Sequence, residues 1–145
     1  MKLGIFFQNN RQGGLDTFLI NLISNFPNKN IDLIVFCNKS HPGLNFLKSK
    51  LKNVQFIEYN FLIYDDLKTK FKDSKFLQLI IKILFGLFGN FYQIIKIIFI
   101  INKNNLDNMF VVSGGFPGGD ANVSALIAWG IKNKKEDYAI YNFHN

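Results

Sequence analysis

Cysteine, histidine and arginine are scarce in this 145-residue chain, and each shortage excludes a class of protein. A single cysteine excludes a disulfide framework within the chain, and the apolar run Ile31 to Cys37 around it predicts a small buried residue in a reducing cytoplasm. Two histidines, one cysteine and scattered acids show no spacing suited to a metal ion. We therefore expect neither disulfides nor a metal.

Arginine occurs once, at Arg11, beside sixteen lysines, and the formal net charge is +7. Because bidentate contacts to bases and phosphates favour arginine, we expect no nucleic-acid partner. Three explanations of the lysines stay open: an anionic membrane surface, a phosphorylated substrate, or ordinary solvated side chains. The dinucleotide fingerprint G-x-G-x-x-G is also missing after every apolar run, which disfavours a nicotinamide cofactor. The opening apolar stretch is too short for a cleavable signal peptide.

Apolar residues are abundant, at 48% hydrophobic and 16% aromatic with seventeen phenylalanines. The length fits one domain, residues 1–145, with a core of its own. We expect some of these apolar side chains to be covered by the surface of a partner.

Apolar runs and helical spacings alternate along the chain. Strands are expected at Leu3 to Phe7, Ile31 to Cys37, Val54 to Tyr59, Phe110 to Ser113 and Tyr138 to Phe143. Helices are expected from Leu15 until Pro27 ends the first, around Leu44 to Leu51, and over Ala121 to Ile131 with Asp120 as N-cap. This βαβ series predicts an α/β fold: a doubly wound, mainly parallel Rossmann-like sheet with helices on both faces.

A long apolar helical segment is expected around residues 76–104. Only Lys82 and Lys96 carry charge between Phe76 and Ile101. The longest uncharged part, Ile83 to Ile95, is short of the ~20 residues that a bilayer requires, so a clean transmembrane span is not expected. At roughly 100° per residue, the polar residues and glycines fall within about a third of the helical circumference: Gln78, Lys82, Gly86, Gly89, Asn90, Gln93 and Lys96.

Two interpretations of this segment carry equal weight. In the first, one helix, or two joined near Gly89, lies in a membrane interface and contacts it through Lys82, Phe85, Phe88, Phe91 and Lys96, with the lysines toward the phosphates. In the second, the segment packs into the core or against another domain.

Three loops with unusual residues follow expected strands. Gly13 and Gly14 open a helix whose N-terminus suits a phosphate or an oxyanion. Four glycines between Gly114 and Gly119 exceed what a turn needs, which indicates a loop pressed against substrate. His144 and Asn145 follow the last strand. Because ligands of parallel sheets bind at the carboxyl edge, we expect a functional ring at His144 and substrate contacts at Gly13, Gly14, Gly114, Gly115 and Asn145.

Structural alternatives stand beside these assignments. Gly13 and Gly14 would also suit a plain tight turn, and His144 a core histidine. Asp16, in the first helical turn, is better explained by the helix dipole than by catalysis. His41 lies next to a proline with no companion ligand and is interpreted as a surface residue.

The chain resembles the amino-terminal domain of retaining GT-B fold glycosyltransferases of family 4. The resemblance rests on three motifs in the family's order: Gln12 to Phe18, Val111 to Gly119 and Asn142 to Asn145. The resemblance covers essentially the whole chain. It departs at Asp16, where family members often have Glu.

The resemblance implies a hexosyltransferase-type enzyme (EC 2.4) that moves a sugar from a nucleotide-diphosphate sugar to a lipid-linked or cell-envelope glycan acceptor, with retention and without metal or cofactor. Gly13 and Gly14 would lie near the donor phosphates and acceptor, and His144 would contact the transferred sugar. The family's amino-terminal domain chiefly holds the acceptor and often touches the membrane. The expected location is cytoplasmic, peripheral on the inner face of the membrane.

The family's nucleotide-sugar pocket belongs to a carboxyl-terminal domain that these residues do not include. We therefore expect the chain to be the acceptor-binding half of an enzyme, with a carboxyl-terminal domain or subunit as partner, and to be inactive alone because departing diphosphate charge must be neutralised. The alternative is a non-catalytic membrane-associated Rossmann-like module that binds a partner or a phosphorylated ligand.

Overall fold

The computed structural model describes residues 1–9, 11–28, 30–61, 64–113, 120–132 and 139–143. Five strands form one sheet in the order β3-β2-β1-β4-β5, and every neighbouring pair is parallel. The strands are β1 Lys2–Gln8, β2 Asp32–Asn38, β3 Gln55–Tyr59, β4 Asn108–Ser113 and β5 Ala139–Phe143. The predicted doubly wound parallel sheet is confirmed, and each strand lies within two residues of its predicted place.

The sheet order reverses between β1 and β4. From β1 the chain proceeds outward to β2 and β3, and from β4 it proceeds the other way to β5. Gln8, Ser113 and Phe143 stand in register across β1, β4 and β5, so these three strands end side by side. Ligands of open α/β sheets bind at such a reversal, outside the carboxyl ends of the strands.

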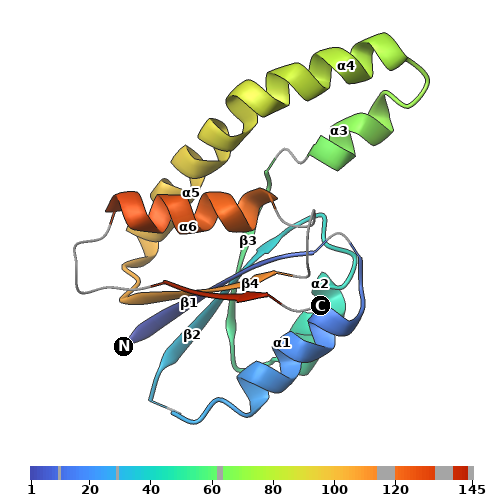
Figure 1. The fold of residues 1–145 in the computed structure, drawn as a ribbon. Coiled ribbons are helices and arrows are strands. Elements are labelled where there is room, and N and C mark those ends of the chain that lie inside the picture. The colour runs from blue at the N-terminus through green and yellow to red at the C-terminus, as the bar shows by residue number, and fades with distance from the viewer. Residues whose placement is uncertain (10, 29, 62–63, 114–119, 133–138, 144–145) are drawn as a thin grey trace.

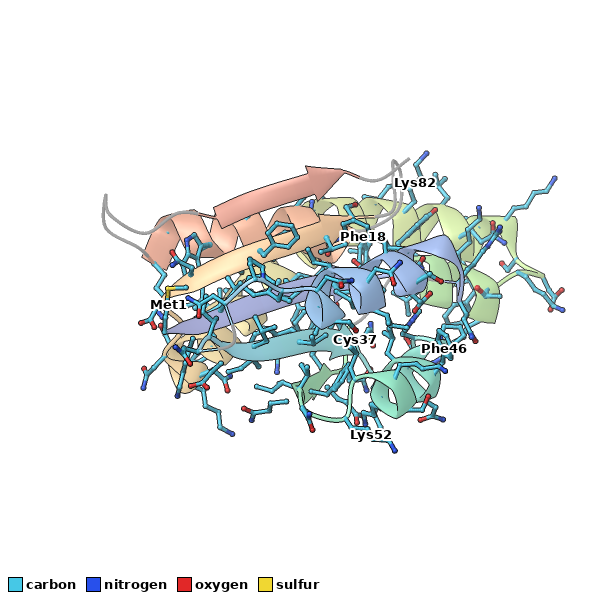
Figure 2. All side chains as sticks on the ribbon, turned by 90° about the horizontal axis from the view of Figure 1, so that it is seen from below. Met1, Phe18, Cys37, Phe46, Lys52 and Lys82 are labelled. Carbon is cyan, nitrogen blue, oxygen red and sulfur yellow. The ribbon has the colours of Figure 1, made fainter. Side chains whose placement is uncertain are left out.

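Helices cover both faces of the sheet, as Figure 1 shows. On one face α1 (Gly14–Ser24) and α2 (Leu44–Lys50) pack over Ile5, Phe7 and Cys37. On the other, α5 (Asn90–Asn104) and α6 (Asp120–Lys132) pack over Phe6. Cys37 lies in the middle of the molecule, as predicted, and its burial raises the pKa of the thiol to about 12 (Figure 2).

A two-helix arm projects from the sheet. It consists of α3 (Tyr64–Lys70), which the sequence analysis did not predict, α4 (Lys75–Leu84) and the π-helical turn η1 (Phe85–Gly89), which continues into α5. Figure 1 shows α3 beside α4, away from the sheet. Lys75–Asn104 is thus one helix of 30 residues, and its glycines do not end it. A π-helical turn replaces the expected break near Gly89.

By length and composition alone this helix could cross a membrane, and only 11% of its most apolar stretch is buried. The expectation that the uncharged part between Lys82 and Lys96 is too short for a clean span stays a prediction. Its two halves differ: α5 buries Gln93, Ile97 and Ile101 against the domain, whereas α4 buries no residue. The interpretation as a core segment thus describes the α5 half, and contact of the exposed α4 half with a membrane stays a prediction.

The predicted polar arc is wrong in part. Lys82 and Lys96 are exposed, but Gly89 and Gln93 from the same arc face inward. Gln93 accepts a hydrogen bond from the Ser124 hydroxyl of α6 at 3.1 Å. A buried amide that has a partner is compatible with a core. Helical spacing alone could not show that Gln93 is buried, because its hydrogen-bond partner lies on another helix.

Candidate functional site

Buried polar side chains gather where the strands end. Among the described residues, eight polar or charged side chains are buried, and six lie at the carboxyl edge of the sheet or in the first helical turn beyond it. These six are Gln8, Asp16, Asn38, His41, Ser113 and Asn122. Buried polar groups cost free energy unless they are paired, so this concentration marks the edge as the polar side of the domain.

Gly13 and Gly14 form the junction between β1 and α1. Gly13 is the N-cap of α1 with an extended φ of 176°, and a Cβ added at either glycine would meet no atom of the described residues within 4 Å. Neither the backbone conformation of Gly13 nor internal space at either position requires glycine. The first N–H groups of a helix lack intrahelical partners, so this open backbone is suited to an anionic or polar ligand.

Asp16 and His41 form a buried pair beneath this junction. Asp16 Oδ1 lies 2.6 Å from His41 Nε2, and Asp16 Oδ2 accepts a hydrogen bond from the Gly13 N–H at 2.7 Å. His41 Nδ1 lies 2.9 Å from the carbonyl oxygen of Asn9. The pair therefore ties the loop after β2 to both sides of the Gly13-Gly14 turn.

The interpretation of His41 as a surface residue without a companion is wrong. The ring is buried, its edge meets Phe7 with centroids 5.3 Å apart, and Asp16 is its partner. Asp16 also does more than favour the helix dipole, because its carboxylate caps Gly13 and contacts another loop. Both ring nitrogens lie within hydrogen-bond distance of an oxygen atom, so the ring is held on two sides.

Gly43 makes room for the pair. A Cβ at this position would lie 2.5 Å from Asp16 Oδ1 and 2.6 Å from His41 Nε2. Because both side chains are buried and hydrogen-bonded, neither can move aside cheaply. The contacts of position 43 with other residues of the chain thus require glycine there, whereas no such contacts require glycine at positions 13 and 14 among the described residues.

The start of α6 is fixed to the same edge. Gln8 Oε1 accepts a hydrogen bond from the Ala121 N–H at 2.9 Å, and Asn122 Nδ2 donates to the Val112 carbonyl at 3.1 Å. Asn122 Oδ1, and Asn38 Nδ2 at the end of β2, are buried atoms with no hydrogen-bond partner in the described part of the chain. Unpaired buried polar atoms are rare and have a functional explanation in many cases.

Four of the predicted site residues, Gly114, Gly115, His144 and Asn145, lie outside the described residues. The strands before them, β4 and β5, end at Ser113 and Phe143 in register beside β1. In the described ranges, no group of three or more His, Cys, Asp or Glu side chains is placed to hold a metal ion.

A cavity of about 790 Å³ lies at the opposite, amino-terminal edge. It is lined by the ends of α1 and α2 and the starts of β2 and β3, including Ile23, Lys50, Asp32 and Gln55. It contains none of the predicted site residues. A second, of about 250 Å³, lies in the arm.

No protein-family model matches the sequence, and no curated protein matches it. Solved structures do match. A protein assigned as a UDP-N-acetylglucosamine 2-epimerase from Listeria monocytogenes superposes with a TM-score of 0.54 at 10% identity, and a second UDP-N-acetylglucosamine 2-epimerase with 0.53 at 10%. The apo form of the lipopolysaccharide outer core galactosyltransferase WaaB gives 0.51 at 16%.

Each match covers 97% of this chain and between 30% and 33% of the other protein. The chain therefore spans about one third of the length of the structures it resembles. At such low identity the likeness establishes the fold and nothing finer. The neighbours are GT-B fold proteins, and the chain has the architecture of a GT-B-like, Rossmann-like domain.

Proposed function

We propose that the chain is the acceptor-binding half of a glycosyltransferase that moves a sugar from a nucleotide-diphosphate sugar to a lipid-linked or cell-envelope glycan. The observation that carries the proposal is the Gly13-Gly14 turn. It stands beside the reversal of the sheet, and nothing inside the described chain accounts for its two glycines. Glycine there is explained by a ligand that approaches the backbone closely.

Two further observations support this function. One neighbour in fold is named as a galactosyltransferase, and two are named as epimerases of a nucleotide sugar. The motifs that resemble family 4 glycosyltransferases also belong to the loops that follow β1, β4 and β5, which end side by side. In this proposal Gly13, Gly14, Gly114, Gly115 and Asn145 bind substrate, and His144 contacts the transferred sugar.

The proposed enzyme retains the configuration of the sugar, uses no metal or cofactor, and needs a second domain or subunit. That partner neutralises the departing diphosphate, so this chain alone is inactive. The proposed location is the cytoplasmic face of a membrane. The long helix Lys75–Asn104 supports this location, because its Phe88 and Phe91 are 64% and 68% exposed and its Lys82 and Lys96 are exposed as well.

The test compares two Gly→Ala changes in the cell that encodes the chain, where whatever completes the enzyme is present. Gly14→Ala and Gly130→Ala both add a methyl group in open space at helical positions. Membranes from each strain are given a panel of radiolabelled nucleotide-diphosphate sugars. We expect Gly14→Ala and His144→Ala to lower transfer by about 10- to 100-fold, because small displacements at a reacting site have effects of that size. Gly130→Ala should transfer at the wild-type rate.

Transfer that Gly14→Ala and His144→Ala leave unchanged would remove both residues from the site. If loss of the chain alters no transfer from any sugar in the panel, the enzyme is excluded. The membrane-associated module that binds a partner or a phosphorylated ligand then becomes the better explanation.

A further inference from the structure

The arm encloses an apolar groove. It has a volume of about 250 Å³ and lies between α3 and the long helix. The only polar side-chain group among its seven lining residues is the hydroxyl of Tyr92. The lining residues are Leu67, Ile81, Leu84, Phe85, Phe88, Gly89 and Tyr92. Small-molecule sites run from about 300 Å³ upward, so this groove suits one part of a larger ligand, such as a hydrocarbon chain.

The π-helical turn η1 shapes the groove. A Cβ at Gly89 would lie 2.8 Å from the Phe85 ring, so glycine at this position lets that ring lie against the helix. Phe85 also meets Tyr64 of α3, with ring centroids 5.9 Å apart. π-Helical turns within α-helices are rare and frequently occur at functional sites.

Lysines stand at either end of the groove. Lys82 precedes Phe85 by three residues and Lys96 follows Tyr92 by four, the spacings of neighbouring side chains on an α-helix, with the π-helical turn between them. Lys96 Nζ lies 5.6 Å from the centre of the Tyr92 ring, which lines the groove. Lys75–Asn104 contains no acidic residue. Because α3 carries two acidic residues, Asp65 and Asp66, as well as two lysines, the net positive charge beside the groove comes from the long helix.

The arm extends toward the edge where the strands end. In Figure 1 the arrows of β4 and β5 point to the right, and α3 and α4 lie beyond them on that side. Figure 2, turned by 90°, shows the arm on the same side, with Lys82 labelled there. The groove is thus on the side of the molecule that carries the Gly13-Gly14 turn.

We propose that this groove binds the hydrocarbon chain of a phosphorylated lipid, with Lys96, beside Tyr92, placed for its phosphate. The inference rests on the proposed function only for the role of the lipid. In that role the lipid anchors the acceptor, and the sugar end of the acceptor reaches the carboxyl ends of the strands. Binding itself can be measured without any sugar transfer.

The test uses the whole chain and farnesyl phosphate below its critical micelle concentration, with binding followed by titration calorimetry. Two Leu→Trp variants form a matched pair. Leu84 lines the groove and is 53% exposed, whereas Leu87, in the same helix, is 59% exposed and outside the lining. A tryptophan at position 84 fills the groove, so we expect a Kd at least tenfold higher for Leu84→Trp and within twofold of wild type for Leu87→Trp.

Farnesol and inorganic phosphate separate the two parts of the ligand. Lys96→Gln should weaken the binding of farnesyl phosphate but leave that of farnesol unchanged, and inorganic phosphate alone should not bind measurably. Circular dichroism verifies that each variant is folded.

Three results would overturn the inference: no binding of farnesyl phosphate by the wild type, equal binding by Leu84→Trp, or an equal loss in both tryptophan variants. The last would mean adsorption to the apolar surface as a whole. If lipid binds as expected while the chain proves irrelevant to sugar transfer, the proposed function fails and the groove remains a lipid site.

Discussion

At the residue scale, the pairing of Asp16 with His41 has two effects: it compensates a buried charge, and it positions a loop. A carboxylate removed from water is costly, and this one is offset by the imidazole ring at 2.6 Å and the Gly13 N–H at 2.7 Å. The same contacts fix the loop on which Gly13 and Gly14 stand. The pair therefore positions the candidate site and does not itself need to touch a ligand.

Removing His41 should be strongly destabilising. His41→Ala leaves the Asp16 carboxylate buried without its partner, and we expect the free energy of unfolding to fall by about 3–5 kcal/mol. Urea titration followed by circular dichroism measures this loss. The double variant Asp16→Asn/His41→Ala should recover part of it, because no buried charge remains.

The exposed pair Lys48–Glu58 provides the control. Lys48 lowers the pKa of Glu58 by a hydrogen bond, yet both side chains are open to solvent, so Lys48→Ala should change stability far less than His41→Ala. A small loss in His41→Ala, equal to that of Lys48→Ala, would show that the buried pair contributes no net stabilisation.

This pair could not be predicted from the sequence. His41 and Asp16 are 25 residues apart, and each has an ordinary local explanation, one as a loop residue before Pro42 and the other as an acid at a helix start. Only the pairing of β1 with β2 brings the two following loops together. Gly43 was the available signal, since a glycine next to His41-Pro42 marks a place where a side chain would not fit.

At the element scale, the long helix Lys75–Asn104 has two environments along one apolar sequence. Ile97 and Ile101 fill the core over β1 and β4, while Leu84, Leu87, Phe88 and others of the arm remain open. Hydrophobic periodicity specifies the helix but not the length over which a partner covers it. Within the described chain, α6 covers only the α5 half.

Two isoleucines of α5 test which face is packed. Ile97 is 0% exposed and Ile95 is 54% exposed, two residues away. Ile97→Ala should lower the free energy of unfolding by about 2–5 kcal/mol, because it opens a cavity in the core. Ile95→Ala, the matched control, should stay within about 0.5 kcal/mol in urea titrations. Equal losses would mean that the helix packs differently.

The sequence predicted the strands well because parallel strands buried on both faces form continuous apolar runs. It missed α3 because Tyr64–Lys70 has one strongly apolar residue, Leu67, and no apolar stripe. That helix is held by contacts with α4 and by the approach of Tyr64 to Phe85 of η1. The apolar groove depends on α3 and was invisible for the same reason.

At the scale of the whole molecule, charge and apolar surface favour the same kind of partner. The net charge is +7, and large apolar side chains are exposed both on the arm and on α6, at Val123, Ile127 and Ile131. A soluble surface seldom leaves so many large apolar side chains open without a function. An anionic bilayer would meet both features, the lysines through its phosphates and the apolar residues through its acyl chains.

Vesicle sedimentation tests this combination. We expect the chain to sediment with vesicles that contain anionic phosphatidylglycerol and to bind phosphatidylcholine vesicles several-fold more weakly, because juxtamembrane lysines contribute about 1 kcal/mol each near an anionic surface. High salt should weaken binding to the anionic vesicles without abolishing it, since screening removes the electrostatic contribution and leaves the apolar one. Phe88→Asp should reduce binding to both kinds of vesicle, whereas Ile97→Ala, which changes a buried residue, should reduce neither. A chain that stays in the supernatant at every lipid charge would mean that a protein, such as the proposed second domain, covers the arm instead.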